Sequence, residues 1–279
     1  MPTLTRRESL LSSAVVAGTV SPGYAADIPD KVKLYQRARG APKGQMALHW
    51  YSGRYWGKRA MQAAIQFFRV DGFSFNKMVL KADGSLSQDM VEVGFWLDPV
   101  GGFLLDDWTN PYNGLSCRPQ HYKSAQSMTF GPDGRAVRNG GTPPGMKFAG
   151  KITEPVVQGD TVWIGEDLIV EAIRPPPEPK PNQPVDPSTV LPPIMTATSL
   201  VTYTMKASDL RKSDDTWIPA TMNYQTMGNW YPWMRMGYET GQCMFQLTGC
   251  KLRSLDEIPP ALRGLIDQRH PGFLKDPGI

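Results

Sequence analysis

A glutamate in an alternating segment is the first candidate for acid–base chemistry. Glu92 lies in residues 91–98, where polar and apolar side chains alternate, and it shares a face of the predicted strand with Trp96. If that face is internal, burial raises the pKa of Glu92, and the carboxyl group can act as an acid or a base. The alternative is a solvent-facing glutamate on an edge strand.

A histidine in an aromatic setting is the second candidate. We expect a strand over residues 117–123, which places His121 next to Tyr122. Imidazole changes its charge near neutral pH, so we predict that His121 and Glu92 are the catalytic acid–base groups. The alternative for His121 is a core histidine whose hydrogen bonds are satisfied by the protein.

A tryptophan-rich segment supplies the candidates for ligand binding. Residues 230–236 hold Trp230, Trp233 and Arg235 around a proline, and so many large side chains are hard to bury in one regular element. We predict that they form the lid of a cavity that Trp96 and Tyr122 also line, because aromatic faces and one guanidinium suit a flat apolar ligand. The alternative is a hydrophobic plug.

The sequence predicts no metal and no cofactor. It contains no G-x-G-x-x-G after a strand, no P-loop, no C-x-x-C and no H-E-x-x-H, and its three histidines lie far apart. Cys243 and Cys250 lie on one predicted strand, roughly 23 Å apart if it is extended, so they cannot pair. Cys117 has the spacing to pair with either of them, but buried free thiols are the favoured interpretation.

The N-terminus has the three parts of a secretory signal. Paired arginines, Arg6 and Arg7, precede a short apolar run, and small residues follow up to Ala25. The adjacent arginines are typical of the twin-arginine variant. The apolar run is shorter than the ~20 residues that a membrane-spanning helix needs, so no stable membrane insertion is expected. We therefore predict that residues 1–25 are removed and that the protein works in the periplasm.

Composition favours a β-rich protein. The 279 residues include 26 prolines and 27 glycines, and 41% are hydrophobic, which suits short strands joined by turns around a sizeable core. The net charge of +4 is small and its lysines and arginines are scattered, so a nucleic-acid partner is not expected. Residues 26–279 are expected to form one β-rich domain, with a proline-rich surface loop at 174–193.

The predicted elements form a meander between two short helices. Helices are expected over residues 31–39, after the N-cap Asp30, and over 259–269. Gly53 and Gly72 are interpreted as turn residues that divide residues 45–56 and 65–80 into strand pairs. Further strands are predicted at 91–98, 161–173, 194–206 and 242–252. The expected fold is a single antiparallel β-barrel or strongly curved sheet, lipocalin-like in outline.

The tryptophan-rich segment also carries a family resemblance. Residues 230–237 resemble the W-L-P-W-M-x-M-G segment of a bacterial and fungal family known only as a domain of unknown function, number 1838. Residues 73–77, 98–99, 108–112 and 255–260 agree with the same family. The resemblance implies no activity; its members often carry twin-arginine leaders, which agrees with the N-terminal prediction.

Two hypotheses from different classes follow. The first is a periplasmic enzyme that isomerises, cyclises or eliminates from a small hydrophobic or aromatic molecule by acid–base catalysis. The second is a non-catalytic periplasmic carrier of such a molecule. The two differ in whether Glu92, His121 and Arg235 converge on one cavity, because buried ionisable groups are a costly lining for a mere carrier. The identity of the molecule, the reaction and the oligomeric state are not predicted.

Overall fold

The computed structural model describes residues 30–173, 186, 188, 190 and 192–279. The predicted signal at residues 1–25 and most of the predicted loop at 174–193 lie outside the described residues. The first described helix, α1 (Lys31–Arg39), has the predicted bounds. The Asp30 side chain accepts hydrogen bonds from the backbone N–H groups of Val32 and Lys33, and Gly40 follows the last turn, so local capping fixes both ends.

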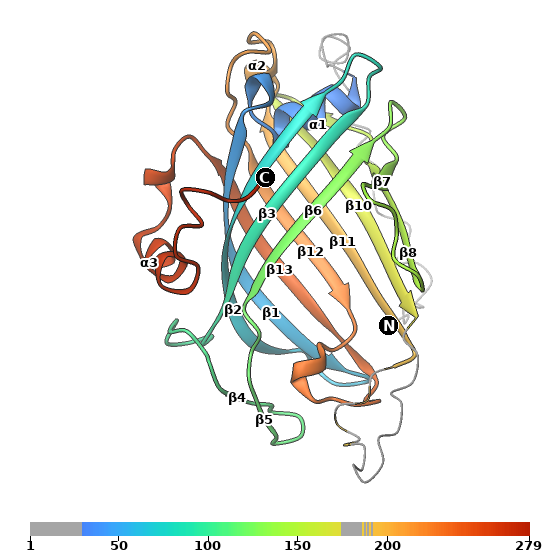
Figure 1. Ribbon diagram of the computed structural model, residues 1–279, viewed down its shortest axis with the longest axis vertical. Coiled ribbons are helices and arrows are strands. Elements are labelled where there is room, and N and C mark those ends of the chain that lie inside the picture. The colour runs from blue at the N-terminus through green and yellow to red at the C-terminus, as the bar shows by residue number, and fades with distance from the viewer. Residues whose placement is uncertain (1–29, 174–185, 187, 189, 191) are drawn as a thin grey trace, which may run out of the picture.

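One antiparallel sheet dominates the described chain and confirms the predicted β fold (Figure 1). Its strands are β1 (Met46–Arg59), β2 (Ile65–Leu80), β3 (Leu86–Leu97), β6 (Tyr122–Phe130), β7 (Ala136–Arg138), β8 (Met146–Ile152), β9 (Val156–Gln158), β10 (Thr161–Ile173), β11 (Ile194–Lys206), β12 (Thr221–Gly228) and β13 (Gly241–Leu252). Their order is β7-β6-β3-β2-β1-β13-β12-β11-β10-β8, with β9 beside β10. A bridge between Arg135 and Lys151 brings the two edges together, so the sheet is a nearly closed barrel.

Two of the predicted turns are wrong. β1 and β2 run without interruption through Gly53 and Gly72. A Cβ at Gly53 would lie 2.2 Å from the carbonyl oxygen of Gln246, and one at Gly72 would lie 2.2 Å from the ring of Tyr51. These glycines therefore let a neighbouring strand or ring approach closely, and they do not turn the chain.

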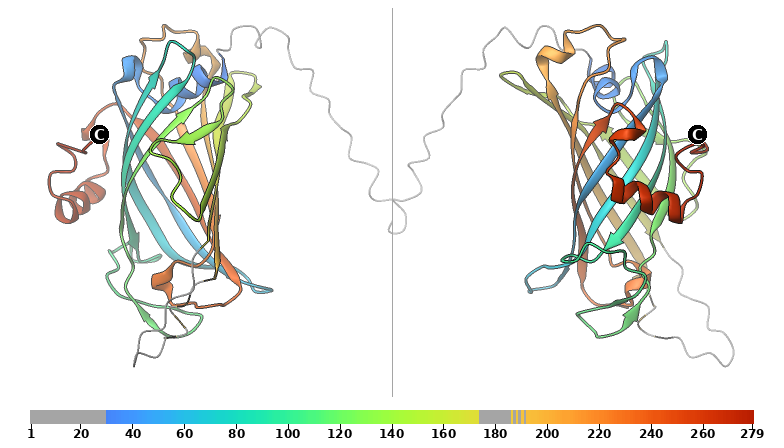
Figure 2. Two further views of the ribbon diagram at one scale, coloured as in Figure 1. Left: turned by 45° about the vertical axis from the view of Figure 1, so that its right-hand side comes forward. Right: turned by 90° about the vertical axis from the view of Figure 1, so that its left-hand side faces the viewer.

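The barrel wall is covered on part of its outer face. Helix α3 (Pro260–Arg269) begins one residue after the predicted start and lies against the outside of the barrel wall (Figure 2, right). Its Leu262 and Ile266 belong to one apolar cluster with Phe75 and Phe95. The apolar face of β3 therefore points outward, against α3, and the face that carries Glu92 points into the barrel.

Shorter elements lie at the two ends of the barrel. Near one end are α1, η2 (Pro42–Gly44) and α2 (Ala207–Leu210); near the other are β4 (Trp108–Thr109), β5 (Ser116–Cys117) and η4 (Pro232–Met234) (Figure 1). The turn η5 (Leu255–Glu257) leads into α3. The predicted strand over residues 117–123 is wrong, because β5 ends at Cys117 and β6 begins only at Tyr122.

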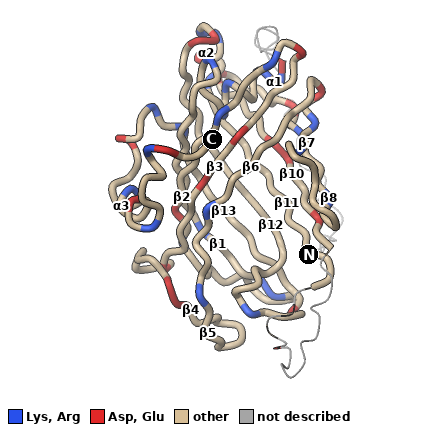
Figure 3. Tube along the Cα trace, in the orientation of Figure 1, with Lys and Arg blue, Asp and Glu red and all other residues tan. Residues whose placement is uncertain are grey.

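Charged positions of both signs are intermixed in the view of Figure 3. The three cysteines are free thiols; Cys117 and Cys243 are buried as predicted, whereas Cys250 is half-buried. In the part of the chain that the structure describes, no helix is long and apolar enough to cross a membrane.

Candidate functional site

The barrel encloses a cavity of about 510 Å³. Side chains from β1–β3, β6 and β10–β13 line it, together with Arg39 of α1 at one end and the η4 segment at the other. The exposed lining residues are Gln120, Lys123, Gln126, Tyr231 and Pro232. Lys123 points outward, with its amine over the ring of Phe273, so the other four mark the mouth of the cavity, between β6 and η4. A volume of this size falls within the range of ~300–1,000 Å³ typical of small-molecule sites.

Two tyrosines lie flat across two glycines on one wall of the cavity. The strand register aligns Tyr51 with Gly72, Gly72 with Gly94, and Gly94 with Tyr122. A Cβ at Gly94 would lie 2.0 Å from the Tyr122 ring, just as one at Gly72 would meet the Tyr51 ring. Because neither glycine has a side chain, the two rings can extend toward each other, and their hydroxyl oxygens are 3.2 Å apart.

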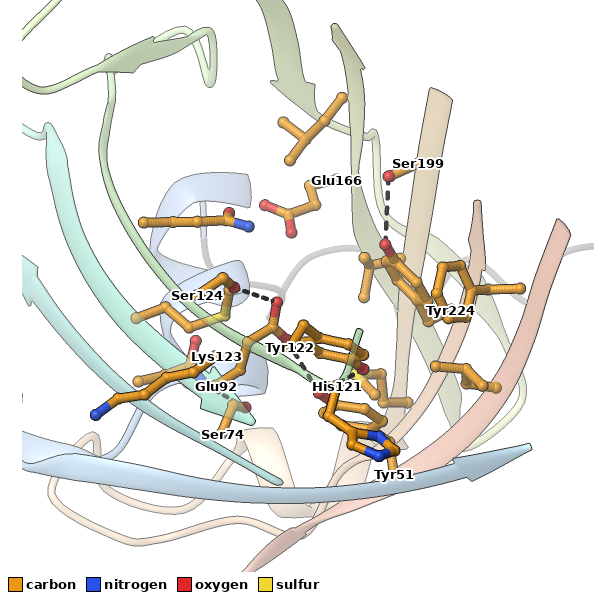
Figure 4. Close-up of a pocket in the computed structure, with 18 of the residues that line it drawn as sticks. Tyr51, Ser74, Glu92, His121, Tyr122, Lys123, Ser124, Glu166, Ser199 and Tyr224 are labelled. Carbon is orange, nitrogen blue, oxygen red and sulfur yellow. Dashed lines mark hydrogen bonds between the residues drawn. The ribbon is translucent and has the colours of Figure 1, made fainter. Parts of the chain in front are cut away.

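Glu92 lies beside this pair of hydroxyls (Figure 4). Its Oε2 accepts a hydrogen bond from the Tyr51 hydroxyl at 3.0 Å, and its Oε1 accepts one from the Ser124 hydroxyl at 2.8 Å. Burial raises the pKa of Glu92, and these two hydrogen bonds and the charge of Arg39 only partly offset that rise. The carboxyl group is thus poised to take up or release a proton inside the cavity.

The two tyrosines remain protonated donors at neutral pH. Burial, helped by the nearby Glu92 carboxylate, raises the pKa of both Tyr51 and Tyr122 well above the ordinary value. Since the Tyr51 hydroxyl donates to Glu92, the Tyr122 hydroxyl is the one that donates across the 3.2 Å contact. A hydrogen-bonded chain therefore runs from Tyr122 through Tyr51 to Glu92.

Five of the predicted site residues line the cavity and two do not. Those that line it are Glu92, Trp96, His121, Tyr122 and Trp233. Trp230 is absent from the lining; it is 3% exposed, packs against Phe67 and donates its indole N–H to the carbonyl of Glu239 at 2.9 Å.

Arg235 is the other predicted residue that does not line the cavity. Its guanidinium pairs with Asp186 at 2.7 Å and bonds to Ser188 at 3.2 Å. The same segment instead contributes Tyr231, whose ring stacks on Trp233 with the planes 10° apart.

Only one ring nitrogen of His121 has a hydrogen-bond partner among the described residues, and the other lies near a carboxylate. Nδ1 accepts the backbone N–H of Trp96 at 3.1 Å, and Nε2 lies 3.7 Å from a carboxylate oxygen of Asp106. Burial lowers the pKa of His121, and Asp106 opposes this only in part. The neutral ring holds the backbone beside Trp96; its catalytic role stays a prediction, and Glu92 is the acid–base group with the better placement.

Several lining residues escaped the sequence analysis. The residues that face the cavity without having been predicted include Tyr51, Ser124, Arg39, Glu166 and Tyr203. The alternation of residues 45–51 puts Tyr51 on one face with His49, which is a weak signal for an inward position. Arg39 and Glu166 are separated by 127 positions, and nothing local to either one indicates that they meet.

No group of three or more potential metal-ligating side chains occurs among the residues that the structure describes. Fold and site together define a small-molecule-sized cavity in an antiparallel barrel, with a carboxylate and a pair of tyrosine hydroxyls on its wall.

In a comparison with known protein families, part of the chain matches a family of unknown function. Residues 147–278 match the family model described as "Protein of unknown function (DUF1838)", which supports placing this part of the chain in that family. The match runs from β8 to beyond α3; the resemblance of the earlier segments stays a prediction. No curated protein matches the chain.

Proposed function

We propose that this chain binds a small, mostly apolar or aromatic molecule in the barrel and moves a proton on it. The observation that carries the proposal is the cluster of Glu92, Tyr51 and Tyr122 on the cavity wall. Trp96, Trp233 and Phe245 supply aromatic surface around it, which suits a ligand with a flat apolar body.

The chemistry needs only groups that this chain supplies. The Glu92 carboxylate takes a proton from the ligand. The Tyr122 hydroxyl turns away from Tyr51 and donates its hydrogen bond to the ligand oxygen that gains charge. Glu92 then returns the proton to another atom of the same molecule, or to a departing group. Isomerisation, cyclisation and elimination all follow this sequence, and none of them requires an external oxidant or reductant.

A non-catalytic carrier is the alternative with the same cavity. A carrier gains nothing from a carboxylate whose pKa is raised, because burying an ionisable group reduces stability without improving the fit to an apolar ligand. The carboxylate of Glu92 therefore favours the enzyme over the carrier.

Native mass spectrometry of protein purified from its own periplasm, with the released ligand then resolved from its isomers by chromatography, separates the two. Wild type is compared with Glu92→Gln, which keeps the shape of the side chain and removes the base. The enzyme proposal expects the variant to retain an unconverted substrate, while wild type carries its product isomer or nothing. Conversion of that substrate by the variant should be slower by about 10²–10⁴-fold. Glu154→Gln is the matched control, since Glu154 is 79% exposed and does not line the cavity.

Three outcomes are informative. The same ligand, unchanged, on wild type and Glu92→Gln means a carrier and overturns the catalytic part. No small molecule on any of the proteins contradicts ligand binding. Substrate retained by Glu154→Gln as well shows that the effect is not specific to Glu92.

We also propose that the molecule is met in the periplasm, after export by the twin-arginine route. Arg6, Arg7 and the small residues up to Ala25 support this location.

A further inference from the structure

The end of the cavity nearest α1 holds a buried ion pair. Arg39 and Glu166 are 5% and 2% exposed, and both line the cavity. Arg39 Nη1 donates to Glu166 Oε1 and, at 2.6 Å, to the hydroxyl of Tyr35; its Nε donates to Asn76 Oδ1 at 3.2 Å. The guanidinium is thus held in place from three sides.

One oxygen of this pair is left without a partner. Glu166 Oε2 is buried and has no hydrogen bond among the described residues. In Figure 4 the carboxylate of Glu166 points into the cavity, on the side away from Tyr51 and His121. A buried carboxylate oxygen without a donor is unfavourable, so a donor brought by a ligand would be bound there.

The charges around Glu166 limit what that donor can be. Arg39 already neutralises Glu166, so an ammonium group would approach a guanidinium at close range. An anionic ligand would meet the carboxylates of Glu92 and Glu166 in the same cavity. An uncharged hydroxyl avoids both conflicts and makes a short, charge-assisted hydrogen bond to the free oxygen.

We infer that Glu166 Oε2 is the recognition site for a hydroxyl group of the ligand. The ligand is then an uncharged molecule with an apolar or aromatic body, a hydroxyl at the Arg39–Glu166 end and its reacting group near Glu92. The inference rests on the proposed function for the second of these positions, but the binding of the hydroxyl does not depend on catalysis.

Two probes of nearly the same shape test it. 2-Naphthol carries a hydroxyl, and 2-methoxynaphthalene has an ether in its place, which accepts a hydrogen bond but cannot donate one. Their dissociation constants are measured by calorimetry for the mature wild-type chain, for Glu166→Gln and for Glu92→Gln. A hydrogen bond to a charged acceptor is worth about 1.5–3 kcal/mol, so wild type should prefer 2-naphthol by roughly 10- to 150-fold.

Glu166→Gln should remove that preference or reverse it. A glutamine can keep its amide oxygen toward Arg39 and present its amide N–H₂ where Oε2 stood, and that group favours an acceptor such as the methoxy oxygen. Glu92→Gln should keep the preference for 2-naphthol within about twofold of wild type, because its substitution does not touch Glu166.

The outcomes separate this inference from the proposed function. If both probes bind but all three proteins discriminate equally, the inference is overturned and the proposed function stands. If Glu92→Gln loses the preference for 2-naphthol instead, the probe hydroxyl binds at Glu92, and the inference about Glu166 is again overturned. If neither probe binds to wild type, ligand binding itself is contradicted.

If Glu166→Gln does not fold, a crystal structure of the wild-type complex with 2-naphthol tests whether the hydroxyl binds Glu166 Oε2. The expected distance from the naphthol oxygen to Glu166 Oε2 is about 2.5–2.7 Å. A naphthol oxygen placed against any other group refutes the inference.

Discussion

Replacing Gly94 by alanine tests whether the Tyr122 ring needs a residue without a side chain at position 94. The added Cβ would lie 2.0 Å from Cζ, 2.2 Å from the hydroxyl oxygen and 2.4 Å from Cε1 of Tyr122. Carbon atoms in contact are normally about 3.5–4.0 Å apart, so the ring or the strand must shift by roughly 1.5 Å. Such a shift breaks the 3.2 Å contact between the hydroxyls of Tyr122 and Tyr51.

The expected cost is about 1–3 kcal/mol of unfolding free energy, which is typical of overpacking a well-packed position. For a chain of this length that corresponds to roughly 2–4 °C in melting temperature per kcal/mol. Urea titrations followed by tryptophan fluorescence measure the change. Gly264→Ala is the matched control: it lies in helix α3, and no atom beyond its chain neighbours and the helix backbone lies within 4 Å of the added Cβ, so it should stabilise by about 0.5–1 kcal/mol.

A double-mutant cycle with Tyr122→Ala identifies the cause. If the clash with the ring is responsible, Gly94→Ala should cost little once Tyr122 is an alanine, and the two substitutions should be strongly coupled. Equal costs of Gly94→Ala in the two backgrounds would refute the role assigned to the ring.

Three further predictions concern charge and export. Because burial raises the pKa of Glu92, the stability linked to its protonation is present below the unfolded pKa and lost as the pH rises through the folded one. Glu92→Gln should therefore be more stable than wild type at pH 8. In parallel urea titrations, the difference in unfolding free energy should become smaller toward pH 4; a difference that does not depend on pH contradicts this prediction. Lys251 is buried, its amine donates to the carbonyls of Arg37 and Gly40, and burial lowers its pKa from 10.5 to about 7. The stability linked to its neutral form is present above the unfolded pKa and lost as the pH falls through the folded one, so wild type should gain stability relative to Lys251→Met between about pH 7 and 10. A constant difference in unfolding free energy over that range is the contrary result. Replacing Arg6 and Arg7 together by lysine should trap the precursor in the cytoplasm, as judged by cell fractionation; normal export of that variant contradicts the twin-arginine route.

Local sequence determined the elements whose boundaries depend on near neighbours. Helix α1 has its predicted ends because Asp30 caps residues two and three positions away and Gly40 ends the last turn. The strands β10 and β11 also have their predicted bounds, since alternation and β-branched residues are properties of a short stretch of chain.

The same local rules failed at Gly53 and Gly72. A glycine that turns the chain and a glycine that admits a neighbouring ring look alike in sequence, because they differ only in what lies opposite. The partner of Gly72 is Tyr51, 21 positions earlier, and the register of the sheet decides that pairing.

Alternation paired Glu92 with Trp96 on one face of β3 but left open which face is internal. That choice depends on α3, which covers the apolar face carrying Phe95 from outside and leaves the face with Glu92 to the cavity. The candidate site was thus only half predictable: Glu92, Trp96 and Tyr122 were identified, whereas Tyr51 and Ser124, which hold the carboxylate, were not.

The sequence by itself determined the β class of the chain and the local ends of its elements, because these depend on contacts within a few residues. Only the tertiary structure decided the site, because its parts come from distant strands. Arg39 meets Glu166 across 127 positions, and Glu92 meets Tyr51 across 41. Such pairs are brought together by the closure and register of the barrel, which no short segment encodes.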